Sequence, residues 1–171
     1  GYKSHAIIPY DQRLELLIAH IQQLQMESNG KSINRDGSKI PTASSGVIWG
    51  EVGTNAQHSF FQLLHQGSDI IPCDFLIAAN AHHDLQHHHE TLIANCFAQS
   101  QALMKGRNLE ETKTHLRKKG LLQADIERIA PHATFPGNRP STTILYKKLD
   151  PKTLGMLIAT YEHKTFVEGV V

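Results

Sequence analysis

The sequence predicts an α/β fold with a mostly parallel sheet covered by helices on both faces, and three observations support this. Short apolar runs alternate along the chain with segments whose apolar residues recur at helical spacing. The apolar runs are continuous rather than alternating in polarity, which is typical of strands buried on both faces. The 171 residues are 40% hydrophobic and 19% charged, which suits one globular domain with its own core.

Each expected element follows from this pattern and from local start and stop signals. Asp11, Asn108 and Asp150 are expected to cap helices, Asn108 in a capping box with Glu111. Residues 29–46 are rich in Gly, Ser, Asn and Asp and predict a long loop or irregular hairpin, of a length that is often functional. Strands are expected at 5–10, 46–51, 69–80 and 141–149, and helices at 11–27, 53–67, 84–104, 108–119, 123–130 and from 151 onward.

Composition excludes several classes of partner. The net charge is +1 and the 17 basic residues are scattered, so we expect no nucleic-acid binding. Cys73 and Cys96 lie in apolar stretches, as buried thiols of a cytoplasmic protein do. No run approaches the roughly 20 apolar residues that cross a bilayer, and the N-terminus has no signal-peptide pattern, so no membrane partner is expected. The chain begins and ends within apolar material, which predicts a piece of a longer protein.

The segment HHDLQHHHE, residues 82–90, is the first candidate for chemistry. On a helix, His83 with His87, or Asp84 with His88, would share a face and could bind a metal ion. The spacing matches no specific metal motif, and histidines at the start of a helix are usually exposed. We therefore expect no metal site, and metal storage by this cluster is kept as an alternative.

The second candidate is His58, in the segment WGEVGTNAQH. Ligands of open parallel sheets bind beyond the carboxyl ends of the strands, which makes the loop after residues 46–51 a candidate site. Its glycines allow a sharp turn from strand to helix, and the new helix N-terminus could attract an anion. A lone histidine near a sheet is more often structural, so its position alone favours a structural role.

The third candidate is Glu27, in the segment QLQMESNGKS. Asn29 and Gly30 predict a helix stop, because both tolerate the left-handed conformation. A carboxylate beside the carbonyl end of a helix is unfavourably placed, so local physics favours a solvated side chain. The alternative is a base that acts with a neutral imidazole beside a carbonyl group of a ligand. From the residues alone, Glu27 and His58 are a possible acid/base pair, and no more specific role follows.

Taken together, the motifs of this chain resemble those of the glucose-6-phosphate isomerase (phosphoglucose isomerase) family. The blocks MESNGK, TN-x-QH, QLLHQG, IPCDF, GNRP and YEHK occur in the family's order from about residue 5 to the end. The resemblance implies a sugar isomerase (SIS) domain, which is a flavodoxin-like three-layer sandwich. Residues 1–171 would be a single, partial C-terminal SIS domain of an isomerase with two such domains.

The function implied by the resemblance is the reversible isomerisation of glucose 6-phosphate and fructose 6-phosphate, in glycolysis and gluconeogenesis. No metal or organic cofactor is implied, and the full-length enzyme is expected to be a homodimer in the cytoplasm. Glu27 would move the proton between C1 and C2 of the sugar phosphate through a cis-enediol intermediate. His58 would help to open the sugar ring in the partner subunit's site, and Gln23, one helical turn before Glu27, would bind substrate.

Two departures and several absences qualify this resemblance. Val52 and Ala56 replace a proline and a glycine of the family pattern, and Ala56 is expected to alter slightly how His58 is presented. The family's phosphate-binding Ser/Thr loops, an arginine and a C-terminal lysine have no counterpart here, so these 171 residues alone are expected to be inactive. The alternative is a non-catalytic SIS module that senses sugar phosphates or mediates assembly. The presence of Gln23, Glu27 and His58 together argues against it.

Overall fold

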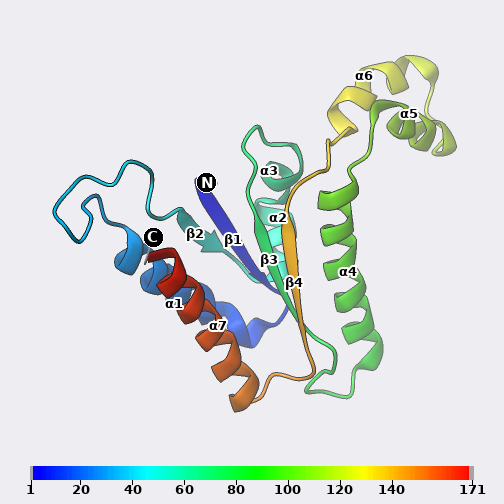
Figure 1. Ribbon diagram of the computed structural model, residues 1–171. Helices are drawn as coiled ribbons and strands as arrows, with labels where there is room; N and C mark the ends of the chain where they lie inside the picture. The colour runs from blue at the N-terminus through cyan, green and yellow to red at the C-terminus, as the bar shows by residue number, and fades with distance from the viewer. Residues whose placement is uncertain (1, 170–171) are drawn as a thin grey trace.

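A single parallel sheet forms the middle layer of the computed structural model, which describes residues 2–169 (Figure 1). The prediction of a parallel sheet is confirmed, because every neighbouring pair of strands runs in the same direction. The strand order is β2-β1-β3-β4, the flavodoxin-like arrangement in which the second strand lies outside the first. The strands are β1 (Ser4–Pro9), β2 (Val47–Gly50), β3 (Cys73–Ala78) and β4 (Ser141–Tyr146).

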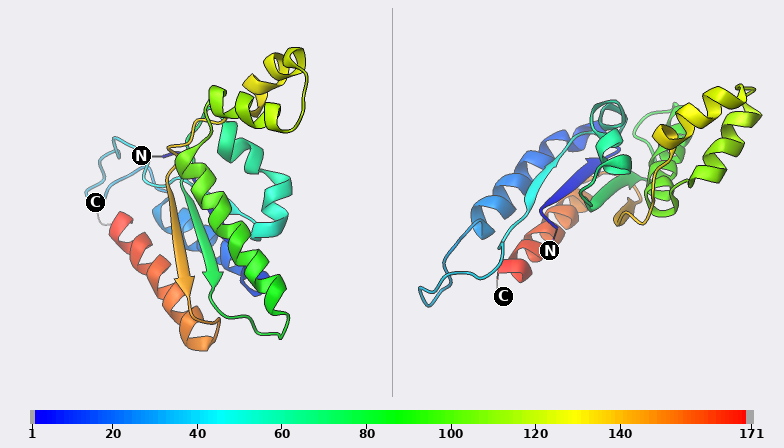
Figure 2. Two further views of the ribbon diagram at one scale, coloured as in Figure 1. Left: turned by 90° about the vertical axis from the view of Figure 1, so that its right-hand side faces the viewer. Right: turned by 90° about the horizontal axis from the view of Figure 1, so that it is seen from above.

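Helices cover both faces of this sheet, as predicted (Figures 1 and 2). Helices α1 and α7 lie on one face, and α2, α3 and α4 lie on the other. The first helix begins as a 3₁₀ turn, η1, and ends in a π-helical turn, η2. The bounds are η1 (Gln12–Leu14), α1 (Glu15–Gln22), η2 (Gln23–Glu27), α2 (Gly53–Ser59), α3 (Phe61–Gln66), α4 (Gln86–Lys105), α5 (Leu109–Lys118), α6 (Gln123–Ala133) and α7 (Pro151–Gly169).

Two hydrophobic cores stabilise the three layers, one on each face of the sheet. All six residues of β3 are buried, which explains its continuous apolar sequence. Successive side chains of a strand point to opposite faces. Ile7 and Leu76 therefore pack against α1 and α7, whereas Ile8 and Phe75 pack against α2 and α4.

The three predicted helix caps are confirmed. The Asn108 side chain accepts a hydrogen bond from the backbone N–H of Glu111 at 2.9 Å, and the Glu111 carboxylate accepts one from the Asn108 N–H at 3.0 Å. Asp150 accepts from the Thr153 N–H at 2.7 Å at the start of α7. Asp11 accepts from the Arg13 N–H at 3.1 Å and caps η1.

The predicted helix over 53–67 is wrong in one respect, because it is broken between α2 and α3. Phe60 leaves the helical conformation, with φ at −136°, and its ring packs edge-on against Trp49 with 4.6 Å between ring centroids. Phe61 is buried in the same core. Adjacent residues of a continuous helix point about 100° apart. The break allows both rings to reach the same core.

Helices α5 and α6 form a hairpin that projects from the amino-terminal edge of the sheet (Figure 2). The hairpin has a small core of its own, built on Leu116, Ile126 and Ala130. At its base the backbones of Gly106 and Gly137 touch, and a Cβ on either would lie 2.5 Å from the other's backbone nitrogen. Both glycines have φ near +70°, a conformation that other residues rarely adopt.

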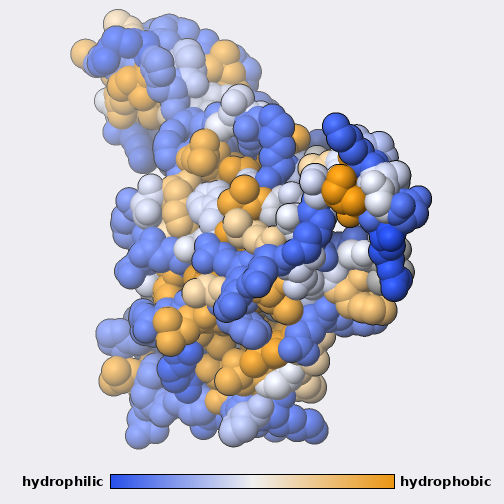
Figure 3. Space-filling model, turned by 90° about the vertical axis from the view of Figure 1, so that its left-hand side faces the viewer, coloured by the Kyte–Doolittle hydropathy of each residue, from blue (hydrophilic) through white to orange (hydrophobic). Residues whose placement is uncertain are grey.

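The outer surface of α1 and α7 carries apolar side chains between polar ones (Figure 3). The exposed apolar residues of α7 are Leu154, Met156, Phe166 and Val167. Within residues 2–169, no helix combines the length and the apolar character needed to cross a membrane.

Candidate active site

The candidate base, Glu27, is the last residue of the π-helical turn η2. A π-turn closes with hydrogen bonds one residue longer than those of an α-helix, and such turns occur frequently at functional sites. No feature of the sequence predicted it, since a π-turn has no residue signature comparable to a cap. The turn and the residues on either side of it, 22–29, present side chains in three pairs, each made of residues four positions apart.

The first pair fastens the turn to the sheet. The Gln22 side-chain amide donates to the Ile48 carbonyl at 3.0 Å, and the Ile48 N–H donates to the Met26 sulfur at 3.4 Å. Ile48 lies on β2, an edge strand, and its outward-facing N–H and C=O groups would otherwise lack hydrogen-bond partners in the sheet. These two contacts therefore cover the sheet edge and fix the turn against it.

The second pair fastens the turn to α7. Lys164 Nζ donates to Gln25 Oε1 at 3.0 Å, and the Asn29 side-chain amide donates to the Thr165 carbonyl at 2.9 Å. Gln25 and Asn29 are both buried. Buried amides are stable only when they are hydrogen-bonded. This pair therefore accounts for the burial of Gln25, to which sequence reasoning assigned no role, and adds an anchoring role to Asn29, the predicted helix stop.

The third pair is Gln23 and Glu27, and both side chains are exposed. Their spacing of four residues places them on the same side of the turn, as predicted. Among residues 2–169, no hydrogen bond or ion pair engages the Glu27 carboxylate. Lys31 Nζ instead donates to the Glu27 backbone carbonyl at 2.8 Å, which satisfies a group at the helix end.

The helix ends at Asn29 and Gly30, as predicted, but not by the predicted conformation. Neither residue has a positive φ. The Gly30 N–H donates to the Met26 carbonyl at 2.9 Å. A Cβ at Gly30 would lie 2.2 Å from that oxygen, so the glycine is required by close approach rather than by a left-handed turn.

His58 lies on α2, where it is exposed. The residues before it hold the helix in place: the Gln57 side chain donates to the Tyr10 hydroxyl at 3.0 Å, and Gly53 packs against the Tyr10 ring. Ala56 is fully buried against the sheet, so its methyl group points into the core. Its contact with the core fixes the side of α2 that His58 occupies.

Glu27 and His58 are not brought together within this chain. Glu27 follows α1 on one face of the sheet, whereas His58 belongs to α2 on the other face. Helix α1 runs back from the carboxyl ends of the strands, so Glu27 lies towards their amino ends, close to the end of α7 (Figure 1). The rule that ligands bind beyond the carboxyl ends of parallel strands therefore favours one edge of the sheet. The family motif places Glu27 near the opposite edge.

The histidine cluster does not form the arrangement that metal binding would need. Helix α4 starts at Gln86, so His83 and Asp84 precede it and the predicted shared helical faces do not exist. His89 is buried, and its Nε2 lies 3.0 Å from the Ala78 carbonyl. In the part of the chain that the structure describes, no three His, Cys, Asp or Glu side chains form a group suited to a metal ion.

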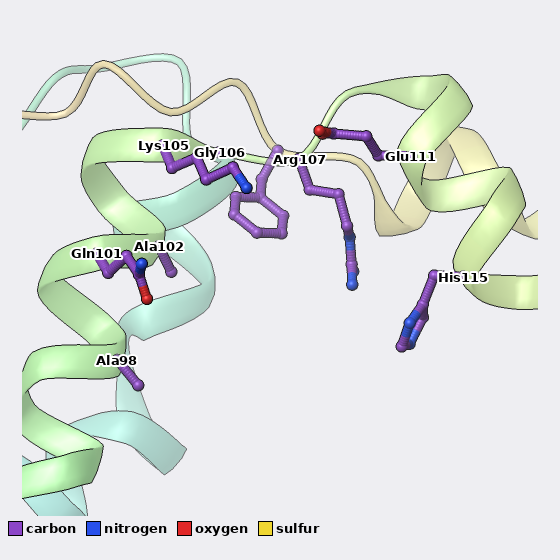
Figure 4. Close-up of a pocket in the computed structure, with 9 residues that line it drawn as sticks. Ala98, Gln101, Ala102, Lys105, Gly106, Arg107, Glu111 and His115 are labelled. Carbon is purple, nitrogen blue, oxygen red and sulfur yellow. The ribbon is translucent and has the colours of Figure 1, made fainter.

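A hollow of about 400 Å³ lies where α4 meets the α5–α6 hairpin (Figure 4). Arg107 extends into it, with its guanidinium 5.3 Å from the centre of the Phe135 ring and a hydrogen bond of 3.1 Å to the Ala133 carbonyl. The carboxylate in its lining, Glu111, is held by the capping box. Because that carboxylate is already engaged, and His115 is the imidazole of the lining, this hollow differs from the surface around Glu27, where the carboxylate is unengaged by any described residue.

Comparison with known proteins identifies the family. The model of the phosphoglucose isomerase family matches residues 1–171. Over the whole chain, the sequence is 59% identical to the glucose-6-phosphate isomerase of Chelativorans sp. (strain BNC1) and 58% identical to that of Mesorhizobium japonicum. The crystal structure of a glucose-6-phosphate isomerase from Chlamydia trachomatis matches 99% of the chain with a TM-score of 0.82 and 40% identity.

The match covers only part of each relative. The chain spans 32% of the Chelativorans protein, 31% of the Mesorhizobium protein and 30% of the Chlamydia chain. The TM-score with the Chlamydia structure is that of a shared fold over almost the whole chain. The chain belongs to the phosphoglucose isomerase family.

Proposed function

We propose that the complete enzyme containing this chain interconverts glucose 6-phosphate and fructose 6-phosphate, with Glu27 as the base. The observation that carries the proposal is the anchored π-turn. Two of its side-chain pairs are bound to β2 and α7, and the third pair presents Gln23 and an unpaired Glu27 carboxylate outward. In the proposed reaction Glu27 takes the proton from C2 of the aldose and returns it to C1 of the cis-enediol. Gln23, beside it, binds the sugar.

His58 is proposed to assist opening of the sugar ring in the site of a second subunit. The support is that the sheet separates His58 from Glu27 within one chain, while both are exposed. A homodimer would allow the His58 of one subunit to approach the Glu27 of the other. The substrate's phosphate would then be bound by the part of the enzyme outside these 171 residues.

The same proposal covers domain organisation and location. The chain is proposed to be most of the C-terminal SIS domain, because its strand order and its coverage of about a third of each relative fit one domain of a larger enzyme. The exposed apolar residues of α7 fit a surface that the rest of that enzyme covers. A cytoplasmic location is supported by Cys73 and Cys96, which are free and buried.

The test is a chimaera in which this chain replaces the matching third of the Chelativorans isomerase. We expect the chimaera to convert fructose 6-phosphate to glucose 6-phosphate. Changing Glu27 to Gln should lower kcat by about 10²- to 10⁴-fold, the usual contribution of a general base, because the amide cannot accept the proton. Binding of a competitive sugar-phosphate inhibitor should stay nearly unchanged, since the base acts in the transition state.

Glu15 provides the matched control, because it is an exposed glutamate at the start of the same helix. Its change to Gln should leave kcat unchanged. If Glu27→Gln kept most of the chimaera's kcat, Glu27 would not be the base. A folded chimaera that binds the inhibitor but does not turn over would favour the alternative, a non-catalytic sugar-phosphate module.

A further inference from the structure

We propose that Lys164 is a positioning residue for Glu27, which it controls through Gln25. This inference rests on the proposed function and adds to it a residue on a different helix. Lys164 lies on α7, and its ammonium group donates to Gln25 Oε1 at 3.0 Å. Gln25 stands two positions before Glu27 in the same π-turn.

The contact joins a buried acceptor to a donor whose side chain is 31% exposed. The exposed fraction of Gln25 is 4%, so its side-chain oxygen has little access to water. Without the lysine, this buried oxygen would lose its donor, and the turn would have to move to satisfy it. A hydrogen bond from a charged donor is about twice as strong as a neutral one. Lys164 therefore favours one position of the turn.

Lys164 is itself held in place by its own helix. Its Nζ also lies 2.9 Å from the Glu168 carboxylate, one helical turn further along α7. The ammonium group is thus shared between a buried amide oxygen and a partly exposed carboxylate. The latter contact is an exposed pair of the kind that contributes little to stability. The contact with Gln25 therefore carries the proposed role.

A second contact joins α7 to a residue that follows the π-turn, so the turn is held at two points. Asn29, which follows the turn, donates to the Thr165 carbonyl, and the end of α7 at Gly169 packs against the Asn29 side chain. Asn29 fixes the end of the turn, and Lys164 fixes its middle. Glu27 lies between these two points. A shift of the turn at Gln25 would therefore be passed directly to the Glu27 carboxylate.

Such a shift matters because proton transfer requires close geometry. A displacement of about 1 Å can cost about 100-fold in rate, even when its cause lies away from the reacting atoms. Removing Lys164 should therefore lower kcat, while the phosphate-binding groups, which the proposed function places outside these 171 residues, stay in position. Because Gln23 belongs to the same turn, the expected signature is a loss in kcat that is larger than any rise in KM.

The experiment compares four variants in the chimaera with the Chelativorans isomerase. Lys164→Met removes the donor, and Gln25→Met removes the acceptor. Each should lower kcat by about 10- to 100-fold with a smaller change in KM. The double variant should lose no more than either single variant, because both remove the same interaction. Lys164→Arg keeps a charged donor and should restore most of the lost kcat.

Glu168→Gln is the matched control, because it breaks the exposed ion pair and leaves the bond to Gln25. It should change kcat by no more than about twofold. Thermal unfolding of each variant reports whether it is folded, and Gln25→Met carries the test if Lys164→Met does not fold. A normal kcat in folded Lys164→Met, or a loss confined to KM, would overturn the positioning role.

The outcome for Lys164 is separable from that of the proposed function. If the unmodified chimaera did not isomerise, the proposed function would fail first. If the chimaera were active and Glu27→Gln inactive, the function would stand. A normal kcat of Lys164→Met in that same chimaera would then reject only the positioning role.

Discussion

At Gly30 the backbone passes so close to the Met26 carbonyl that a side chain has no room. Replacement of Gly30 by Ala would place a Cβ 2.2 Å from that oxygen and force the end of the π-turn to move. We expect a loss of about 1–3 kcal/mol in the free energy of unfolding, the range for a strained backbone position. Chemical denaturation measures the loss, and kcat of the chimaera should fall as well because Glu27 is displaced.

Gly155 is the control for this substitution. It lies exposed within α7, and a Cβ there would meet no atom within 4 Å. Gly155→Ala should stabilise the protein by about 0.5–1 kcal/mol, since alanine loses less conformational freedom in a helix than glycine does. Equal effects of the two substitutions would contradict the close-approach explanation of Gly30.

For His58, the expected phenotype depends on the form of the substrate. His58→Ala in the chimaera should reduce turnover of the cyclic sugar phosphate more than turnover of its open-chain form, because the proposed role is ring opening. Stopped-flow assays with each form measure the two rates. His88→Ala, which removes an exposed histidine from α4, should affect neither. Equal losses on both forms after His58→Ala would count against ring opening.

At the scale of the element, the capping box of α5 decides how firmly the α5–α6 hairpin is folded. Asn108→Ala removes the bond from the Glu111 N–H and should cost about 0.5–2 kcal/mol. Amide hydrogen exchange should show the loss as faster exchange in α5 than in β3. The same substitution at Asn95, an exposed position inside α4, should be neutral or slightly stabilising. Unchanged exchange in α5 after Asn108→Ala would show that the cap is dispensable.

The elements show where sequence reasoning succeeds. Continuous apolar runs predicted all four strands, and Asp11, Asn108 and Asp150 predicted three helix starts, because both signals are local. The break at Phe60 was missed because it depends on Trp49, which belongs to another element. The burial of His89 had a signal that went unused: Leu92, Ile93 and Cys96 follow it at three, four and seven residues, so it extends their apolar face.

The site shows where sequence reasoning reaches its limit. The residues around Glu27 favoured a solvated carboxylate, and only the family motif selected it as a base. The structure adds the physical setting, since the π-turn depends on Ile48 and Lys164, which lie 21 and 137 residues further along the chain. Contacts across such separations leave no periodic pattern in the sequence. Their partners were therefore unpredictable from local signals.

At the scale of the whole molecule, the buried thiols predict sensitivity to alkali. Burial raises the pKa of Cys73 to about 12, with a smaller contribution from Asp74, and burial raises that of Cys96 to about 12. Well below pH 9 both thiols are protonated in the folded and the unfolded states, so their contribution to stability does not change with pH. Above it the unfolded thiols release protons that the folded ones retain, so stability falls as pH rises.

The measurement is the Tm as a function of pH. We expect a constant Tm between about pH 7 and 8.5 and a steady fall between about pH 9 and 11. Burial also raises the pKa of Tyr10 and Tyr161, which extends the fall to higher pH. Cys96→Ala should lower the Tm throughout but flatten its decline. A Tm that stays constant to pH 11 would contradict this account.

The contact between Gly106 and Gly137 bears on where the domain can accept insertions and deletions. The chain leaves the end of α4 and turns back towards β4 at two touching points, so the 30 residues between Gly106 and Gly137 are placed like an insertion. Apart from these glycines, Gln66 of α3 ties the segment to the domain by donating to the His132 and Thr134 carbonyls. We expect changes of length within α5 and α6 to leave the path from α4 to β4 unaltered, whereas changes around Glu27 would disturb a turn that a strand and a helix hold at once.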